Sequence, residues 1–224
     1  MDWQAIGLSV RLAAATTVIL LAIGLALAYW LTFSRRRWKF LVEAVVALPL
    51  VLPPTVLGFY VLLAIGPHSP IGALYARVGG GTLPFSFQGL LIASVLYSLP
   101  FMVHPIQSGL RSLSPSLREA SFTLGKSKWT TLVKILLPNI RASVITGFVL
   151  TFAHTIGEFG VVLMVGGNIA GKTRLISIAM YDEVQSMNYH TANIYAGILF
   201  AFSFLILFVV YLVNNRSGEI SPLA

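Results

Sequence analysis

Residues 12–33 read LAAATTVILLAIGLALAYWLTF, and residues 34–39 directly after them read SRRRWK. The first stretch carries no charged side chain over 22 residues, and a helix needs roughly 20 apolar residues to cross a bilayer core. A basic cluster behind such a run is typical of a helix end that stays in the cytoplasm. A cleavable signal peptide is the alternative, because Ala26-Leu27-Ala28 resembles a cleavage site, but such peptides place their charge before a shorter apolar run. We therefore predict a spanning helix with an external N-terminus.

The composition of the whole chain agrees with a membrane protein. Of its 224 residues, 57% are hydrophobic and 10% are charged, and the mean hydropathy is +0.85. Soluble domains carry about 25% charged residues, so a soluble enzyme is excluded. The chain has no cysteine, which excludes disulfides, thiol catalysis and Cys-ligated metals.

Four further apolar runs follow the first. We predict an all-α integral membrane protein with one transmembrane domain, residues 1–224, and five spans, at 12–33, 40–65, 89–110, 143–165 and 194–213. With an external N-terminus, residues 34–39, 111–141 and 214–224 lie in the cytoplasm, and so does the C-terminus. These three segments hold 11 of the 15 Lys and Arg residues. This satisfies the positive-inside rule, so the net charge of +8 requires no nucleic-acid partner.

Prolines interrupt two of these spans. Pro53 and Pro54 lie in the second, and Pro100 and Pro105 lie in the third. Each removes a backbone donor and disturbs the preceding turn, so we expect kinked or locally unwound helices. Broken backbone at membrane depth needs a protein partner or a water-filled cavity. These spans are therefore expected to face partners or a pathway, with a static packing kink as the alternative for any single proline.

Residues 166–173, GGNIAGKT, match the nucleotide-binding pattern G-x-x-x-x-G-K-T. That mechanism needs a buried strand before the loop and an acidic strand end for Mg²⁺. Here a spanning helix precedes the loop, and the predicted topology places the loop outside, away from ATP. We therefore reject nucleotide binding and interpret Lys172 and Arg174 as solvated charges of an external loop that can face an acidic partner or attract an anion.

The longest polar stretch is the predicted cytoplasmic segment 111–138. Its first part reads RSLSPSLREASFTLGKSKW. Ser114 and Pro115 fit the N-cap and the first position of a helix, and Gly125 fits its C-terminal stop. Such a short amphipathic helix is either a docking element or an interfacial helix.

At these residues the chain resembles a transport family. Glu119-Ala120-Ser121, Gly125, Ile135 and Leu137-Pro138 follow the pattern E-A-A-x3-G-x9-I-x-L-P of type I ABC importer permeases, with Ser121 in place of the second alanine. Residues 48–58, 155–160 and 167–174 are similar to segments of molybdate permeases, and the resemblance covers nearly the whole chain.

This resemblance implies the transmembrane subunit of an ATP-driven importer of molybdate or tungstate in the bacterial inner membrane, with a permease core at about 9–213. It implies a homodimer, two cytoplasmic ATPase subunits that bind ATP and Mg²⁺, and an external substrate-binding protein. The chain itself would bind no cofactor or metal and would not be an enzyme. The alternative is a type I permease for sulfate or methionine. The implied ATPase-coupling residues are Glu119, Ala120, Ser121, Gly125, Ile135, Leu137 and Pro138.

The fourth predicted span carries a polar stripe at i, i+3, i+4 and i+7. Ionisable residues inside a membrane are candidates for function, but a free carboxylate repels molybdate. Glu158 is therefore either structural, paired with His154 or with the other subunit, or part of the gate. Hydroxyl groups and backbone amides suit a weakly attractive oxyanion path. The candidate pathway residues are Pro53, Pro54, Thr55, Thr151, His154, Thr155 and Glu158.

Two other functional classes fit the sequence less well. A secondary transporter or channel would show inverted repeats or charged relays in several spans, and neither is visible. A membrane-bound enzyme or a passive anchor subunit is the remaining class, and we find no credible catalytic constellation in the sequence.

Overall fold

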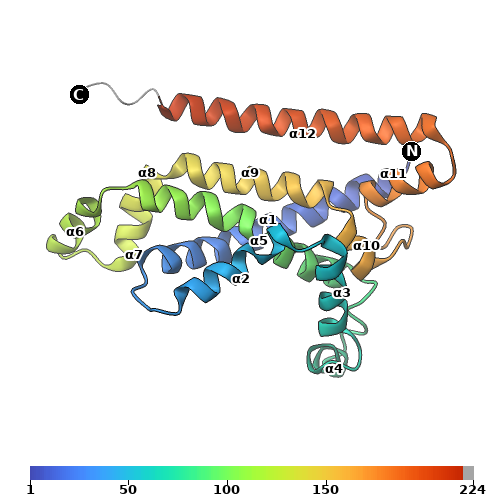
Figure 1. Cartoon of the computed structure of the whole chain (residues 1–224), viewed down its shortest axis with the longest axis horizontal. Helices are drawn as coiled ribbons and strands as arrows, with labels where there is room; N and C mark the ends of the chain where they lie inside the picture. Colours follow the sequence, from blue (N-terminus) through green and yellow to red (C-terminus); the bar gives the residue numbers. More distant parts are fainter. Residues whose placement is uncertain (219–224) are drawn as a thin grey trace.

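The computed structural model describes the backbone of residues 1–218 and the side chains of residues 1–212. All regular secondary structure of the described residues is helical (Figure 1), which confirms the all-α prediction. Residues 219–224, with the predicted cytoplasmic C-terminus, and the side chain of Arg216 lie outside the described residues. In chain order the helices are α1 (Trp3–Phe33), α2 (Lys39–Val51), α3 (Pro54–Ile65), α4 (Pro70–Arg77), α5 (Phe87–Ser112), α6 (Pro115–Thr123), α7 (Lys128–Thr131), the π-helix η1 (Leu132–Leu136), α8 (Leu137–Asn139), α9 (Arg141–Gly157), α10 (Gly160–Gly166), α11 (Ile176–Gln185) and α12 (Tyr189–Gly218).

Three described helices are long and apolar enough to cross a membrane, namely α1, α5 and α12. Two bent pairs bring the number of candidate spans to five if each pair crosses as one unit. The first pair, α2 with α3, bends by 118°, and the second, Lys128–Asn139 with α9, bends by 80°.

The bend between α2 and α3 follows from the proline pair. Leu52 and Pro53 both have extended backbone, with ψ of 139° and 134°, because a residue before a proline is disfavoured in the helical region. The local unwinding expected for the second span is therefore found here. The helix α5 instead continues through Pro100 and Pro105 without a break.

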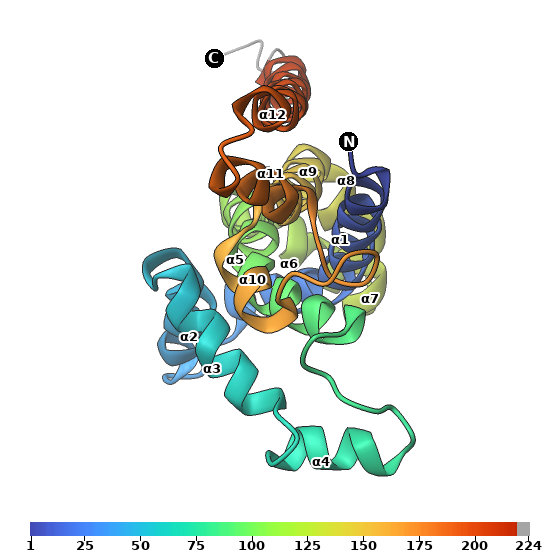
Figure 2. The same ribbon diagram turned by 90° about the vertical axis from the view of Figure 1, so that its right-hand side faces the viewer.

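The helix α5 is the centre of the bundle. It packs against α1 on one side and α9 on the other, and α1 also contacts α9. The largest buried cluster joins these elements to η1 and includes Leu20, Met102, Ile106 and Leu136. The helix α12 lies along the outside of α9 and α11 (Figures 1 and 2), and most of its side chains are exposed.

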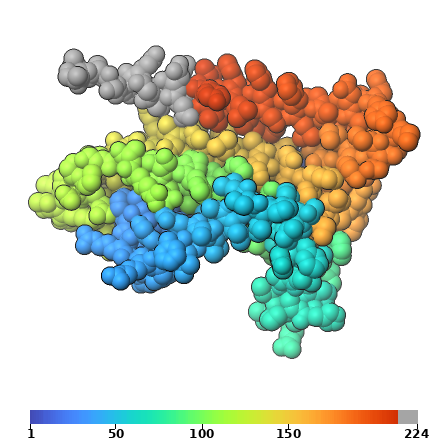
Figure 3. Space-filling model, viewed as in Figure 1, coloured from blue at the N-terminus to red at the C-terminus, as the bar shows by residue number. Residues whose placement is uncertain are grey.

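Helices α3 and α4 form an arm that leaves the bundle at the bend after α2. The arm stands out from the surface in the space-filling view (Figure 3) and projects below the bundle in Figure 2. Its base is fixed because α3 packs against α10. The contact is close at two glycines: a Cβ on Gly58 would lie 2.8 Å from the Met164 Cβ, and one on Gly160 would lie 2.7 Å from the Pro54 Cβ. Small residues permit such close helix contacts in membranes.

Gly58→Ala is expected to lower the stability of the purified protein, because the new methyl group also meets the Val161 Cα at 3.1 Å. Overpacking of this kind costs about 1–3 kcal/mol. Thermal unfolding in detergent measures the effect. Gly197→Ala in α12 is the matched control, since no atom lies within 4 Å of its added Cβ. That variant is expected to be neutral or slightly more stable. Equal melting temperatures for the two variants would contradict the α3–α10 contact.

Candidate functional site

A cavity of about 560 Å³ lies where the bases of α3 and α10 meet α5 and the end of α9. Two chain breaks border it, the one between α2 and α3 and a further one between α9 and α10. It is lined by Pro54, Thr55, Tyr97, His154, Gly157, Glu158, Phe159, Gly160, Leu163 and Met164. Four of the predicted pathway residues, Pro54, Thr55, His154 and Glu158, thus surround one cavity.

The predicted fourth span, 143–165, is not one continuous helix. The helix α9 ends at Gly157, Glu158 has extended backbone with φ −71° and ψ 140°, and α10 begins at Gly160. Gly157 and Gly160 flank this break, and they favour it because glycine weakens a helix interior by about 1 kcal/mol relative to alanine. Outside the helix, the Glu158 carbonyl accepts a hydrogen bond from the Ser177 hydroxyl of α11. Glu158 therefore occupies the corner between α9 and α10 and not the fourth position of a helical stripe.

The buried Glu158 carboxylate does not pair with His154. The His154 Nδ1 lies 3.0 Å from the Ser98 Oγ, and its ring stacks on Phe101 with 4.0 Å between ring centres. The Glu158 carboxylate approaches the backbone N–H of Val161 at the start of α10. Among the described residues neither carboxylate oxygen has a hydrogen bond of good geometry. His154 and the other subunit are the two structural partners that the sequence suggests for Glu158. His154 contacts Ser98 instead of Glu158.

The other predicted pathway residues lie outside the cavity lining. Thr151 and Thr155 are fully buried, and the Thr155 hydroxyl donates to the Thr151 carbonyl at 2.9 Å. Ser98 Oγ lies 3.1 Å from Thr155 Oγ1. Ser98 thus links Thr155 to His154 and holds the His154 ring in place. Pro53 is the residue before α3 and does not line the cavity.

Two residues of α5 belong to the site although the sequence analysis did not select them. Tyr97 lines the cavity, and Ser98 holds His154. Ser94, Tyr97 and Ser98 recur at i, i+3 and i+4 in an otherwise apolar helix. This polar spacing is a signal that could have identified them.

The predicted coupling segment forms a helix, a tight turn and a second short helix. Pro115 is the first residue of α6, as expected, but the Ser114 side chain makes no capping bond and instead contacts the Ser116 hydroxyl at 2.7 Å. Gly125 follows α6 with φ +71°. The Gly125 N–H donates to the Phe122 carbonyl, and the Lys126 N–H donates to the Ser121 carbonyl. This is the Schellman arrangement, which needs the left-handed backbone that glycine adopts without strain.

Ser121, which replaces the second alanine of the signature, is buried between α6 and α7. Its hydroxyl lies 2.8 Å from the Thr131 hydroxyl, which itself donates to the Ser127 carbonyl. The substitution therefore adds a hydrogen bond that ties α6 to α7. The opposite face of α6 is exposed, and it presents Glu119 and Ala120.

The remaining signature residues lie at the joint between this segment and α9. Ile135 is part of η1, and Leu137 and Pro138 are part of α8. Pro138 has no N–H for the next helical bond. The turn before it is wider than an α-helix, with the Leu137 N–H donating to the Leu132 carbonyl.

The loop that matches the nucleotide-binding pattern is folded around Thr173. This side chain is fully buried, its hydroxyl donates to the Gly166 carbonyl at 2.7 Å, and its oxygen accepts from the Ile169 N–H. The hydroxyl is therefore not available to a metal ion. The helix α10 precedes the loop, and the described chain contains no strand. The geometry agrees with the rejection of nucleotide binding.

A polar clasp joins this loop to α11 and to the start of α1. The Arg174 Nε donates to the Asn168 Oδ1 at 2.6 Å and lies 3.6 Å from an Asp182 carboxylate oxygen. The Arg174 Nη1 lies 3.9 Å from the Asp2 carboxylate. Asp2 also caps α1 by accepting from the Ala5 N–H, and its own N–H donates to the Tyr195 hydroxyl of α12. Arg174 is thus a structural residue of this end of the bundle.

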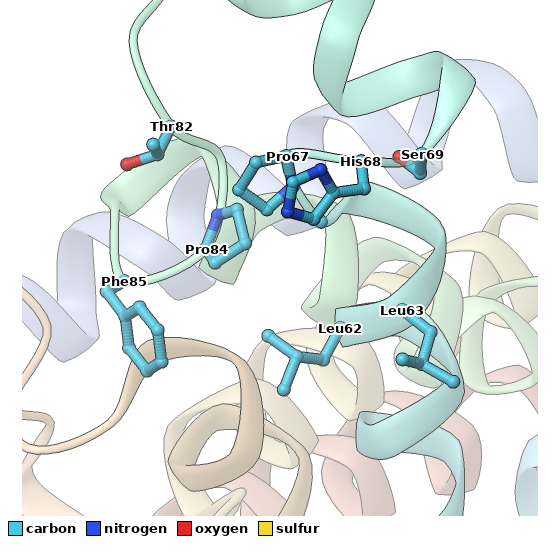
Figure 4. Close-up of a pocket in the computed structure, with 9 residues that line it drawn as sticks. Leu62, Leu63, Pro67, His68, Ser69, Thr82, Pro84 and Phe85 are labelled. Carbon is cyan, nitrogen blue, oxygen red and sulfur yellow. The ribbon is translucent and has the colours of Figure 1, made fainter.

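A second cavity, of about 380 Å³, lies between the end of α3 and residues 82–85 (Figure 4). Leu62, Leu63, Pro84 and Phe85 line it together with His68. Its lining includes as many side-chain hydrogen-bond donors as that of the cavity at Glu158, namely His68, Ser69 and Thr82, but it lies on the arm, away from the two chain breaks. Among the described residues there is also no group of three or more His, Asp or Glu side chains that could hold a metal ion.

Comparison with known proteins gives matches over almost the whole chain. Residues 19–217 match the model of the family described as "Binding-protein-dependent transport system inner membrane component". "Molybdenum transport system permease protein ModB" of Azotobacter vinelandii is 50% identical over 210 residues, which cover 94% of this chain and 93% of that protein. The protein of the same description from Escherichia coli K12 is 36% identical over 185 residues, covering 83% and 81%.

The fold has counterparts among solved structures. The chain resembles one in the crystal structure of a bacterial alginate ABC transporter in complex with an alginate pentasaccharide-bound periplasmic protein, with a TM-score of 0.74. The match covers 97% of this chain and 78% of the other at 17% identity. At this level of identity the similarity concerns the fold alone.

Thr173→Val is expected to destabilise the protein, because it leaves the Gly166 carbonyl and the Ile169 N–H without their partner. Unsatisfied buried groups cost about 1–3 kcal/mol each. Lys172→Ala, at the exposed neighbouring position, is expected to change neither the melting temperature nor ATP hydrolysis by the assembled transporter. ATP binding by the purified chain without an ATPase partner, lost in Lys172→Ala, would restore the nucleotide-binding interpretation.

Proposed function

Because the chain belongs to the family of binding-protein-dependent transport system inner membrane components, we propose that it is the transmembrane subunit of an ATP-driven importer of molybdate or tungstate. The observation that carries this proposal is its similarity to the Azotobacter vinelandii molybdenum permease along nearly the full length of both chains. ATP hydrolysis belongs to a separate ATPase subunit. A sulfate or methionine permease is the alternative.

The substrate pathway in this proposal runs through the cavity at Glu158. The cavity lies at the N-terminal turn of α3, where the helix dipole favours an anion, and Thr55 and Tyr97 offer hydroxyl groups there. The lining of this cavity includes neither Lys nor Arg, so it attracts an oxyanion only weakly, as release requires. Glu158 keeps its two candidate roles, a structural residue paired with the other subunit or a part of the gate.

The proposal includes a homodimer. The α3–α4 arm stands away from the bundle (Figure 3), and Tyr60, Leu63 and Leu74 on it are 63%, 56% and 64% exposed. A second copy would cover these apolar side chains and close the cavity at Glu158. Two-fold symmetry is the commonest arrangement of identical subunits.

The proposed orientation places α6 in the cytoplasm and the N-terminus outside, with five spans within a permease core at about 9–213. Figure 1 shows α6 and the N-terminus at opposite ends of the bundle. The end with α6 carries most of the basic residues, which favours the cytoplasmic side. An external binding protein would then deliver the oxyanion at the end formed by the clasp around Arg174 and by the arm.

The coupling residues are proposed to act through α6, which lies beyond the ends of α5 and α9 (Figure 1). Its exposed face carries Glu119 and Ala120, and Leu124 next to it is 74% exposed. The Schellman turn at Gly125 and the bond between Ser121 and Thr131 hold α6 on α7. A docked ATPase could therefore move α6, α7 and α9 as a rigid unit and switch the pathway between two states.

The transport proposal is tested by oxyanion accumulation in bacterial cells that lack their own molybdate permease. Cells expressing this chain with its ATPase and binding protein are expected to accumulate molybdate, measured by mass spectrometry of cell-associated molybdenum. Tungstate is expected to compete, because its size and charge are nearly the same, and sulfate is not. Accumulation of sulfate or methionine without molybdate would identify the alternative permease and overturn the substrate assignment.

Gly125→Val is expected to reduce uptake about tenfold or more, because a β-branched residue at φ +71° costs about 1–3 kcal/mol and distorts the docking turn. Glu119→Lys reverses a charge on the docking face and is expected to have the same effect. Uptake, membrane level and copurification of the ATPase are measured together.

Gly79→Val is the matched control for backbone strain. Gly79 has φ +84° and open space around it, as Gly125 has, but it lies after α4 at the other end of the molecule. This variant is expected to retain most of the uptake. Normal uptake in Gly125→Val and Glu119→Lys at normal membrane levels would show that α6 is not the coupling element.

A further inference from the structure

We propose that the end of the bundle carrying α6 binds an anionic phospholipid, with its headgroup in a basic cavity between α1 and α6 and an acyl chain in an adjoining apolar cavity along α1. The inference depends on the chain lying in a bilayer and not on the substrate that it transports. Two neighbouring cavities of different chemistry carry the argument.

The headgroup cavity has a volume of about 340 Å³ and lies between the end of α1, α6 and α7. Three cations line it, namely Arg35, Arg118 and Lys128, and no acidic residue does. Among the described residues none of the three forms an ion pair. The Arg118 guanidinium is instead held over the Phe33 ring, 4.3 Å from its centre. Three unpaired cations around one cavity favour an anionic ligand.

The acyl cavity has a volume of about 510 Å³ and lies deeper along α1. It shares Tyr29 and Lys128 with the headgroup cavity, so the two are adjacent. The rest of its wall is mostly apolar and includes Ala22, Ala26 and Leu132. From Ala22 to Phe33 a helix rises about 16 Å, which is comparable with the length of an acyl chain.

The boundary between the two cavities lies at the level of several aromatic side chains. Trp129 beside the acyl cavity is 72% exposed, and Trp30 and Trp38 pack together with 5.2 Å between their ring centres. Trp and Tyr concentrate where hydrocarbon meets headgroups. The basic cavity thus lies at headgroup level, and the apolar cavity extends from this level along α1 to Ala22, inside the predicted first span.

This arrangement favours a phospholipid over the two other anionic occupants considered. A free phosphate would use the basic cavity alone and leave the apolar one without a role. An acidic segment of the ATPase would reach the basic cavity from the cytoplasm but would not enter the hydrocarbon. Basic cavities between membrane helices on the cytoplasmic side bind the headgroups of anionic lipids. A bound headgroup would also neutralise the repulsion among the three cations and fix α6 to the end of α1.

The test uses the full chain in phosphatidylcholine nanodiscs, with Trp3, Trp30 and Trp38 replaced by Phe so that Trp129 reports alone. Phosphatidylglycerol with brominated acyl chains is titrated in, and brominated phosphatidylcholine serves as the reference quencher. We expect phosphatidylglycerol to quench Trp129 at a lower mole fraction than phosphatidylcholine does.

Arg35→Gln and Lys128→Gln are each expected to lower this preference about fivefold. Ala26→Phe, which fills the apolar cavity, is expected to weaken quenching while all three cations remain.

The matched control is the double variant Lys126→Gln with Lys134→Gln, which removes two charges at the same end that line neither cavity. It is expected to keep the preference, and so is the original chain in the presence of excess glycerol 3-phosphate. Equal quenching by the two lipids, or an equal loss in the control variant, would overturn the proposal. Displacement by glycerol 3-phosphate would assign the cavity to free phosphate, and loss of the preference on addition of the ATPase would assign it to an acidic protein segment. Either of these outcomes would also overturn the lipid assignment.

Discussion

The hydrocarbon core of a membrane requires that every backbone N–H and carbonyl group finds a partner inside the protein. In this chain the backbone leaves the helical path at Pro53, between α2 and α3, and at Glu158, between α9 and α10, and the structure places these two interruptions against each other. Gly160 lies so close to Pro54 that a side chain at position 160 would meet the Pro54 ring. The Glu158 carbonyl, released from the helix, is bound by Ser177. The cavity forms because the two interruptions lie next to each other. The irregular backbone is tolerated at this depth because it lines the cavity.

The unbroken helix α5 makes this arrangement rigid. It packs on α1 and α9 and supplies Tyr97 and Ser98 to the site. The cavity at Glu158 lies on the side of α10, while the segment with α6 follows directly from the opposite end of α5. A single continuous helix therefore connects the proposed docking site to the proposed pathway, and α9 provides a second connection through the bend at Ile140.

Local chemistry in the sequence predicted much of this fold. The uncharged run before the Arg35 cluster identified α1, the proline pair at Pro53 predicted the break between α2 and α3, and Gly125 predicted the helix stop after α6. The sequence did not reveal the end of α9 at Gly157, because residues 143–165 contain no proline and their polar side chains keep helical spacing, while the break is stabilised by Ser177, a distant residue of α11. Helical spacing therefore grouped Glu158 with Thr151, although the folded chain separates them. For the same reason the pairing of His154 with Ser98 could not be foreseen, since it depends on how α5 packs against α9.

The exposed position of α12 has an evolutionary consequence. Side chains such as Phe200, Phe204 and Tyr211 touch little of their own chain, with exposed fractions of 75%, 64% and 73%. Selection at these positions acts on the affinity of the side chain for the membrane more than on how it packs against the protein. One apolar residue can therefore replace another with little effect. Tyr195 is under a different constraint, because its buried hydroxyl meets the N–H of Asp2 at the start of α1. Among related chains, sequence drift in this last helix should therefore be fast on the outward face and slow at the few positions that hold it to the bundle.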